Sequence, residues 1–139
     1  MKRLSLGNAK PLTITEYGRV AFRVPETLKT WIDAQVALRG SAKAHKTKFI
    51  TECIVDFLDS PDVEEVLAMS GLLPPSSSKH VIETASLTEP LRIRCWWAAI
   101  DNAVLLAKSD EPIYLEPNVT HVIKSALFWC QSKGEKRVV

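Results

Sequence analysis

Two short segments of the chain alternate arginine or alanine with apolar residues, and they span residues 19–25 and 91–95. In an extended chain, alternate side chains point to opposite faces. One face then carries Arg19, Ala21, Arg23, Arg92 and Arg94. The other carries Val20, Phe22, Val24, Leu91, Ile93 and Cys95. A guanidinium group donates two parallel hydrogen bonds to a carboxylate, a phosphate or a guanine edge. We therefore predict two strands, each with an apolar face and a face that binds an anion or a base edge.

The positive charge of the chain is concentrated toward its N-terminal end. The 139 residues carry a net charge of only +2. Residues 1–48, however, contain ten lysines and arginines against three acids, whereas residues 49–116 contain four against twelve. A segment with this excess of positive charge favours binding to a polyanion such as nucleic acid.

Two predicted helices begin at a threonine, and lysines flank the first of them. Thr47 is a good N-cap residue with Lys46 and Lys48 beside it, while Thr120 is followed by His121. The free N–H groups and the dipole at a helix start attract anions. These five residues are therefore candidates for binding phosphate groups. The second set is expected to bind less strongly because it lacks the lysines.

The rest of the pattern predicts helices joined by short connections. The expected helices span residues 26–39, 47–58, 63–69, 98–108 and 120–131. The first follows Pro25 and ends at Gly40, and the third ends at Gly71, because proline suits a helix start and glycine a helix end. Residues 74–79 have the proline- and serine-rich composition of a linker.

The two halves of the chain repeat the order strand, helix, loop, helix. Residues 47–54 superpose on residues 120–127 with the capping and core positions retained. Residues 31–34 resemble residues 99–102, but this alignment needs a gap before the two strands superpose. We therefore predict an internal repeat.

The pattern over residues 19–58 resembles the ribbon-helix-helix family of DNA-binding proteins, of the Arc and MetJ type. The resemblance rests on residues 20–26, on residues 46–52 and on the spacing of Leu28, Ile32 and Val36. It implies that two strands pair into an antiparallel ribbon that enters the DNA major groove above four helices. One such unit cannot stand alone, because its strand has both edges unpaired. Most members homodimerise, but the second strand and helix pair here resemble the rarer single-chain tandem form, as in accessory proteins of conjugation.

The expected fold class is mostly α with a short two-stranded antiparallel ribbon, arranged as a tandem ribbon-helix-helix pseudo-dimer in one chain. A flexible basic arm (residues 1–16) precedes the first unit (17–60). A connecting helix and a Pro/Ser linker (61–87) lead to a second, diverged unit (88–132) and a tail (133–139).

The resemblance also implies roles for individual residues. The base-contacting candidates are Arg19, Ala21, Arg23, Arg92 and Arg94. The phosphate-contacting candidates are Lys46, Thr47, Lys48, Thr120 and His121. Ala21 departs from the polar residue usual at its position, although it can touch a thymine methyl group. The arm residues Lys2, Arg3 and Lys10 are candidates for further DNA contacts, beside the alternative of a solvated tail.

In function, the resemblance implies a sequence-specific double-stranded DNA-binding protein that acts as a transcriptional repressor or regulator. One alternative is an accessory DNA-binding protein of plasmid conjugation, which binds a transfer origin within a relaxosome. Another is an antitoxin-like protein-binding module, in which residues 62–139 are extended around a toxin. The expected partners are double-stranded DNA, further copies of the chain along the DNA, and a relaxase or another protein.

Other classes of function lack support in the sequence. We do not expect an enzyme, because there is no glycine-rich phosphate loop, HExxH motif or nucleophile with a base nearby. Cys53, Cys95 and Cys130 form no CxxC pair and indicate buried thiols in a reducing compartment, so neither a metal nor a cofactor is expected. No apolar stretch predicts a membrane span or signal peptide, which favours a cytoplasmic protein. Trp96 and Trp97 are expected to pack where the first helix of the second unit begins.

Overall fold

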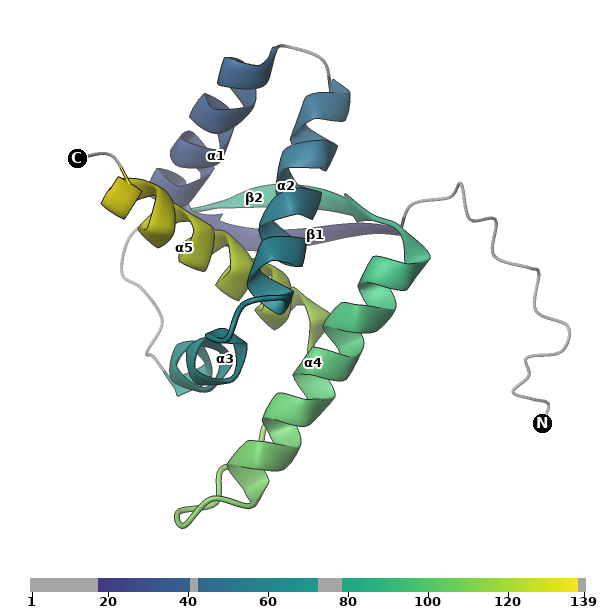
Figure 1. The fold of residues 1–139 in the computed structure, drawn as a ribbon, viewed down its shortest axis with the longest axis vertical. Helices are drawn as coiled ribbons and strands as arrows, with labels where there is room; N and C mark the ends of the chain where they lie inside the picture. The colour runs from purple at the N-terminus through teal and green to yellow at the C-terminus, as the bar shows by residue number, and fades with distance from the viewer. Residues whose placement is uncertain (1–17, 41–42, 73–78, 138–139) are drawn as a thin grey trace, which may run out of the picture.

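The computed structural model describes residues 18–40, 43–72 and 79–137 (Figure 1). Its elements in chain order are β1 (Gly18–Pro25), α1 (Glu26–Arg39), α2 (Lys43–Leu58), α3 (Val63–Leu72), β2 (His80–Leu87), α4 (Glu89–Ala107) and α5 (Val119–Arg137). The two strands form one antiparallel sheet, so the expectation of a mostly helical protein with a two-stranded antiparallel ribbon is confirmed. The strand predicted over residues 19–25 and the helix predicted over residues 26–39 are confirmed as β1 and α1.

The inner face of the ribbon packs against the helices. In the register of the sheet, Gly18 lies opposite Leu87 and Pro25 lies opposite His80. The inward side chains are Val20, Phe22, Val24, Val81, Glu83, Ala85 and Leu87. Figure 1 shows the ribbon crossing behind α2 and α5, which cover this face. The apolar face predicted for β1 is therefore its buried face.

The second strand lies earlier in the chain than predicted. Residues 91–95, expected to form a strand, belong to the first turns of α4, and the strand is β2 within residues expected to be linker. The reason is the buried face of α4, which consists of Leu91, Cys95, Ala99, Asn102 and Leu106. These positions recur every three or four residues, as a helix requires. Thr88 starts this helix, since its Oγ1 accepts a hydrogen bond from the Leu91 N–H at 3.4 Å, and Pro90 occupies its first turn.

The predicted repeat is partly reproduced in the pattern of burial. In α2 and α5, which pack against each other, the buried apolar residues include Phe49, Ile50, Cys53, Ile54, Val122, Ile123, Ala126 and Leu127. These are corresponding positions of residues 47–54 and 120–127. The alignment of residues 31–34 with 99–102 is wrong. The corresponding helices α1 and α4 begin at Glu26 and Glu89, and aligning these two starts places buried Leu28 on buried Leu91.

The helix boundaries differ from the predictions at several ends. Helix α2 begins at Lys43, so Thr47 lies inside the helix and is not its N-cap. Helix α5 begins at Val119, and the Thr120 N–H donates a hydrogen bond to Asn118 Oδ1 at 2.8 Å, so the capping side chain is Asn118. Helix α3 continues past Gly71 to Leu72, and α5 continues to Arg137 through most of the predicted tail.

The cysteines and tryptophans divide between core and surface. Cys53 and Cys95 are buried, as predicted, whereas Cys130, which was also predicted to be buried, is half-buried. Burial raises the pKa of the Cys95 thiol to about 11. Trp31 and Trp129 pack on buried phenylalanine rings, with centroids 5.5 and 5.6 Å apart. The expectation for Trp96 and Trp97 is wrong: their exposed fractions are 44% and 59%, because α4 buries its opposite side.

We expect opposite effects on stability from adding a methyl group at two of the glycines. Gly40 has φ +127°, and a Cβ there would lie 2.6 Å from His45 Cε1, so Gly40→Ala should lower the free energy of unfolding by about 1–3 kcal/mol. Gly134 is helical, and its added Cβ would lie at an ordinary 3.6 Å from Trp31, so Gly134→Ala should raise it by about 0.5–1 kcal/mol. Urea unfolding of both variants measures the difference. Equal effects would contradict the positive φ of Gly40.

Candidate nucleic-acid interface

The outer face of the ribbon carries four cross-strand pairs, and Pro25 with His80 forms the pair at one end. Arg19, Ala21 and Arg23 of β1 are exposed and point away from the helices, as predicted. The register places them opposite three residues of β2. The other three pairs are Arg19 with Ser86, Ala21 with Thr84, and Arg23 with Ile82. The outer face thus presents two guanidinium groups, two hydroxyl groups and an exposed isoleucine on one short surface.

The two arginines of this face are not neutralised by neighbouring acids. Among the residues that the structure describes, none forms an ion pair or hydrogen bond with the side chain of Arg19 or Arg23. The eight outer positions include no carboxylate. Both guanidinium groups can therefore donate hydrogen bonds to an anion or a base edge outside the molecule.

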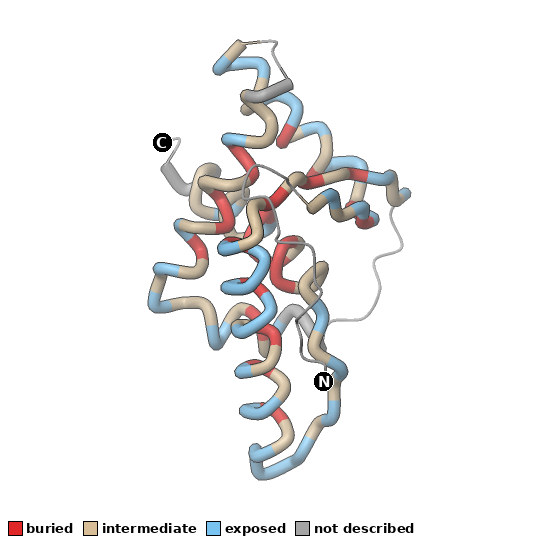
Figure 2. The backbone as a smooth tube through the Cα atoms, turned by 90° about the vertical axis from the view of Figure 1, so that its right-hand side faces the viewer, coloured by how far each residue is buried: buried red, intermediate tan, exposed pale blue. Residues whose placement is uncertain are grey.

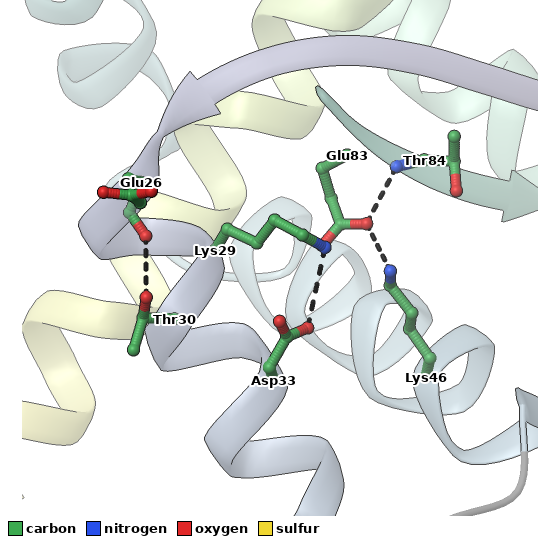
Figure 3. Close-up of polar contacts among 7 residues, drawn as sticks. All are labelled: Glu26, Lys29, Thr30, Asp33, Lys46, Glu83 and Thr84. Atoms are coloured by element: carbon green, nitrogen blue, oxygen red, sulfur yellow. Dashed lines mark hydrogen bonds and ion pairs between the residues drawn. The ribbon is translucent and has the colours of Figure 1, made fainter. Parts of the chain in front are cut away.

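The acid of the ribbon, Glu83, points inward and is held by two lysines (Figure 3). Its side chain is 1% exposed, Lys29 Nζ of α1 lies 3.2 Å from Oε2, and Lys46 of α2 pairs with Oε1. The Thr84 N–H also donates a hydrogen bond to Oε1 at 2.9 Å. The buried carboxylate therefore connects β2 to α1 and α2.

The pKa of Glu83 reflects two opposing effects. Burial raises the pKa, but the hydrogen bonds from Lys46 and the Thr84 N–H and the nearby lysine charges outweigh burial, so the pKa lies below its ordinary value. The pKa of Lys29 also reflects two opposing effects. Burial lowers it, but the charge of Glu83 raises it by more, so the pKa of Lys29 lies above its ordinary value. Both groups are therefore charged at neutral pH.

The predicted phosphate-binding residues separate in the structure. Lys46 is turned to Glu83, so its charge is largely compensated inside the molecule, whereas Lys48 on the same helix is exposed. Thr47 is half-buried. His121 Nε2 lies 3.0 Å from the carbonyl oxygen of Leu67, so its ring connects α5 to α3. Thr120 lies beside it in the first turn of α5.

The candidates Arg92 and Arg94 are not on the ribbon, because residues 91–95 are helical. Arg92 packs against Gly18, where a Cβ would collide with its guanidinium group, and it lies 3.8 Å from Glu89. Arg94 donates a hydrogen bond to Asp59 at 2.8 Å. Arg92 thus remains next to one end of the ribbon, whereas Arg94 does not. The arm candidates Lys2, Arg3 and Lys10 lie outside the described residues.

Ile82, Thr84 and Ser86 were missed by sequence reasoning. Their strand does not show apolar alternation, because Glu83 occupies an inward position and Ile82 an outward one. A signal was nevertheless present in Thr88 and Pro90, a capping residue with a first-turn proline, which together mark a helix start directly after residue 87.

Comparison of the chain with protein-family models, with curated protein sequences and with solved structures finds no match. Within the described part of the chain, no helix has the length and apolar character needed to cross a membrane.

We expect Glu83→Gln to destabilise the protein by about 3 kcal/mol at neutral pH, because it leaves two lysines facing an uncharged group at a buried site. In the native chain, the pKa of Glu83 is lower in the folded state than in the unfolded state. Its charge therefore stabilises the fold at pH values above the ordinary glutamate pKa, and this stability is lost as the pH falls through the folded-state pKa. The variant should therefore lose less stability on acidification. Urea unfolding at a series of pH values measures both effects.

The matched control is Glu52→Gln, which removes a partly exposed carboxylate bonded to Arg39. Exposed ion pairs contribute about 0–1 kcal/mol. If Glu52→Gln lowers the free energy of unfolding as much as Glu83→Gln does, the buried contact of Glu83 does not stabilise the fold more than an exposed ion pair.

Proposed function

We propose that this chain is a sequence-specific double-stranded DNA-binding protein that inserts its β-ribbon into the major groove and acts as a transcriptional regulator. The single observation that carries the proposal is the outer ribbon face, which has two arginines without described partners and no carboxylate. A two-stranded ribbon fits the width of the major groove, and arginine is the commonest side chain to pair with guanine there.

The element order supports a tandem ribbon-helix-helix arrangement. One strand and two helices (β1, α1 and α2) are followed by a second strand and two helices (β2, α4 and α5), with α3 between the sets. The two strands pair with each other, so one chain supplies both halves of the ribbon. This arrangement would remove the need for a partner chain to complete the DNA-binding surface.

The two halves of the ribbon differ in chemistry, which favours a target without two-fold symmetry. The offset between α1 and α4 makes Ile82, Thr84 and Ser86 the counterparts of Arg19, Ala21 and Arg23. An arginine can pair with guanine, whereas isoleucine can contact a thymine methyl group and a hydroxyl can bond to several base edges. A palindromic site is required of a symmetric dimer but not of such a chain.

Packing of the second half favours this function over the antitoxin-like alternative, which expects residues 62–139 to be extended. Helices α4 and α5 instead pack on each other and on α2. The tandem arrangement is equally compatible with an accessory role in plasmid conjugation. The two roles share the DNA-binding surface and differ in whether the target lies at a promoter or at a transfer origin.

Selection of bound sequences from a random DNA pool tests the proposal. We expect enrichment of one asymmetric site, with guanine at the positions contacted by Arg19 and Arg23. Recovery of no enriched sequence would overturn sequence-specific binding, and a perfect palindrome would overturn the unequal halves of the ribbon.

We expect Arg23→Ala to weaken binding to the selected site by about 1–3 kcal/mol and to weaken binding to random DNA much less, because it removes a base contact. The matched control is Arg39→Ala, which also removes one positive charge. The guanidinium group of Arg39 lies on α1 and pairs with Glu52 at 2.6 Å, so it is not part of the outer ribbon face. Titration of both variants against both DNAs measures the difference. An equal loss on both DNAs for Arg23→Ala would contradict its role in base recognition.

Lys48→Ala should weaken binding to all DNA sequences alike and reduce the slope of log affinity against log salt by about 0.9, the value for one phosphate contact. Lys48 is exposed on α2, and the control Lys108→Ala changes an exposed lysine directly after α4. We expect an unchanged slope for the control. If Lys48→Ala leaves the slope unchanged as well, Lys48 does not contact a phosphate.

A further inference from the structure

Helix α4 is apolar on two opposite sides. One side is buried in the core. The other side carries the residues that we call the α4 stripe: Ile93, Trp96, Trp97, Ile100 and Val104. Four of the five are 43–59% exposed, and Ile100 is half-buried. In Figure 1, α4 runs away from the ribbon, and Figure 2 shows exposed positions along the side of α4 that faces the viewer.

An exposed stripe of this kind marks an interaction surface. Single exposed apolar residues are common in proteins, but a contiguous patch with two tryptophans is not. Ile93, Trp97, Ile100 and Val104 are spaced by four, three and four residues, the spacing with which paired helices pack against each other. The stripe therefore fits another helix.

We propose that the occupant is the α4 helix of a second copy of this chain, packed antiparallel across a two-fold axis. In such a pair, Trp97 of each copy lies opposite Ile100 of the other, and Ile93 lies opposite Val104. At the edge of the stripe, the large Trp96 lies opposite the small Ala103 of the second copy. The apolar surface is thus complementary to itself.

The charges beside the stripe favour this occupant and this direction. Arg94 and Asp101 are both exposed and lie on the same flank of α4, one heptad apart. In the antiparallel pair, Arg94 of each copy faces Asp101 of the other, so two opposite-charge contacts form. A parallel pair would instead set Asp101 against Trp96 of the other copy, where it has no opposite charge. Arg94 would then face Glu89, which already pairs with Arg92 of its own chain. Arg94 already bonds to Asp59, but a guanidinium group has five donors and can bind a second carboxylate.

The surface beside this flank has space for a bulky side chain. A groove of about 300 Å³ lies between α3 and α4, and Leu67, Arg94, Trp97 and Asp101 contribute to its lining. A Trp97 ring from the second copy would lie next to Asp101, at this groove. The interface of one 19-residue helix is small, so we expect a dissociation constant on the order of micromolar.

Dimerisation through α4 does not depend on the proposed DNA binding, because the stripe and the outer ribbon face share no residue. If both hold, the dimer carries two ribbons and can contact two DNA sites at once. The experiment is therefore done without DNA.

Sedimentation of the full chain over a range of concentrations tests the proposal. We expect the mass to rise from 15.5 kDa toward twice that value. Asp101→Lys and Arg94→Glu should each sediment as monomers, because each sets like charges against each other. An equimolar mixture of the two variants should form the dimer again, since both contacts then join opposite charges.

Controls separate a lost interface from a lost fold. Leu38→Glu changes an 81% exposed leucine on α1, outside the stripe, and should leave the dimer unchanged. Circular dichroism should show native helix content for every variant. A native chain that stays monomeric up to about 100 µM, a concentration well above micromolar dissociation constants, would overturn the proposal. So would a dimer that Asp101→Lys leaves intact, or a mixture that stays monomeric.

Discussion

The structure depends on the pairing of two short strands that lie far apart in the chain. A two-stranded ribbon has little stability in water unless one of its faces is buried. Here β1 and β2 bury that face on α2 and α5, and these helices in turn bury their apolar sides on each other. Pairing, helix packing and exposure of the outer face therefore form together. The ribbon cannot present Arg19 and Arg23 to a partner without the helices of both halves.

The buried contact of Glu83 with Lys29 and Lys46 adds specificity to this packing. A carboxylate on the inner face costs free energy of desolvation, which two lysines and a backbone N–H offset. The arrangement also separates charge by face. The acid and its lysines lie beneath the ribbon, while the outer face keeps its arginines free of acidic neighbours.

The two apolar sides of α4 give the second half of the chain a property that the first half lacks. Helix α1 buries Leu28 and Ile32 on one side, and its other side is mainly polar. Helix α4 buries one side in the same way but exposes Trp96 and Trp97 on the other. The chain therefore has two separate surfaces. We propose that the outer ribbon face binds DNA and that the α4 stripe binds a second copy.

The sequence by itself determined β1, α1 and the buried stripes of α2 and α5, because each shows a clear period of two or of 3.6 residues. Only the tertiary structure decided the second strand. Residues 91–95 alternate like a strand, yet Leu91 and Cys95 also match a helical face that continues to Leu106. Residues 80–87 lack the clear alternation of a half-buried strand, because a glutamate, Glu83, occupies an inward position. That position is tolerated because Lys29 and Lys46, distant in sequence, meet the carboxylate in the folded chain, and no local pattern encodes that contact.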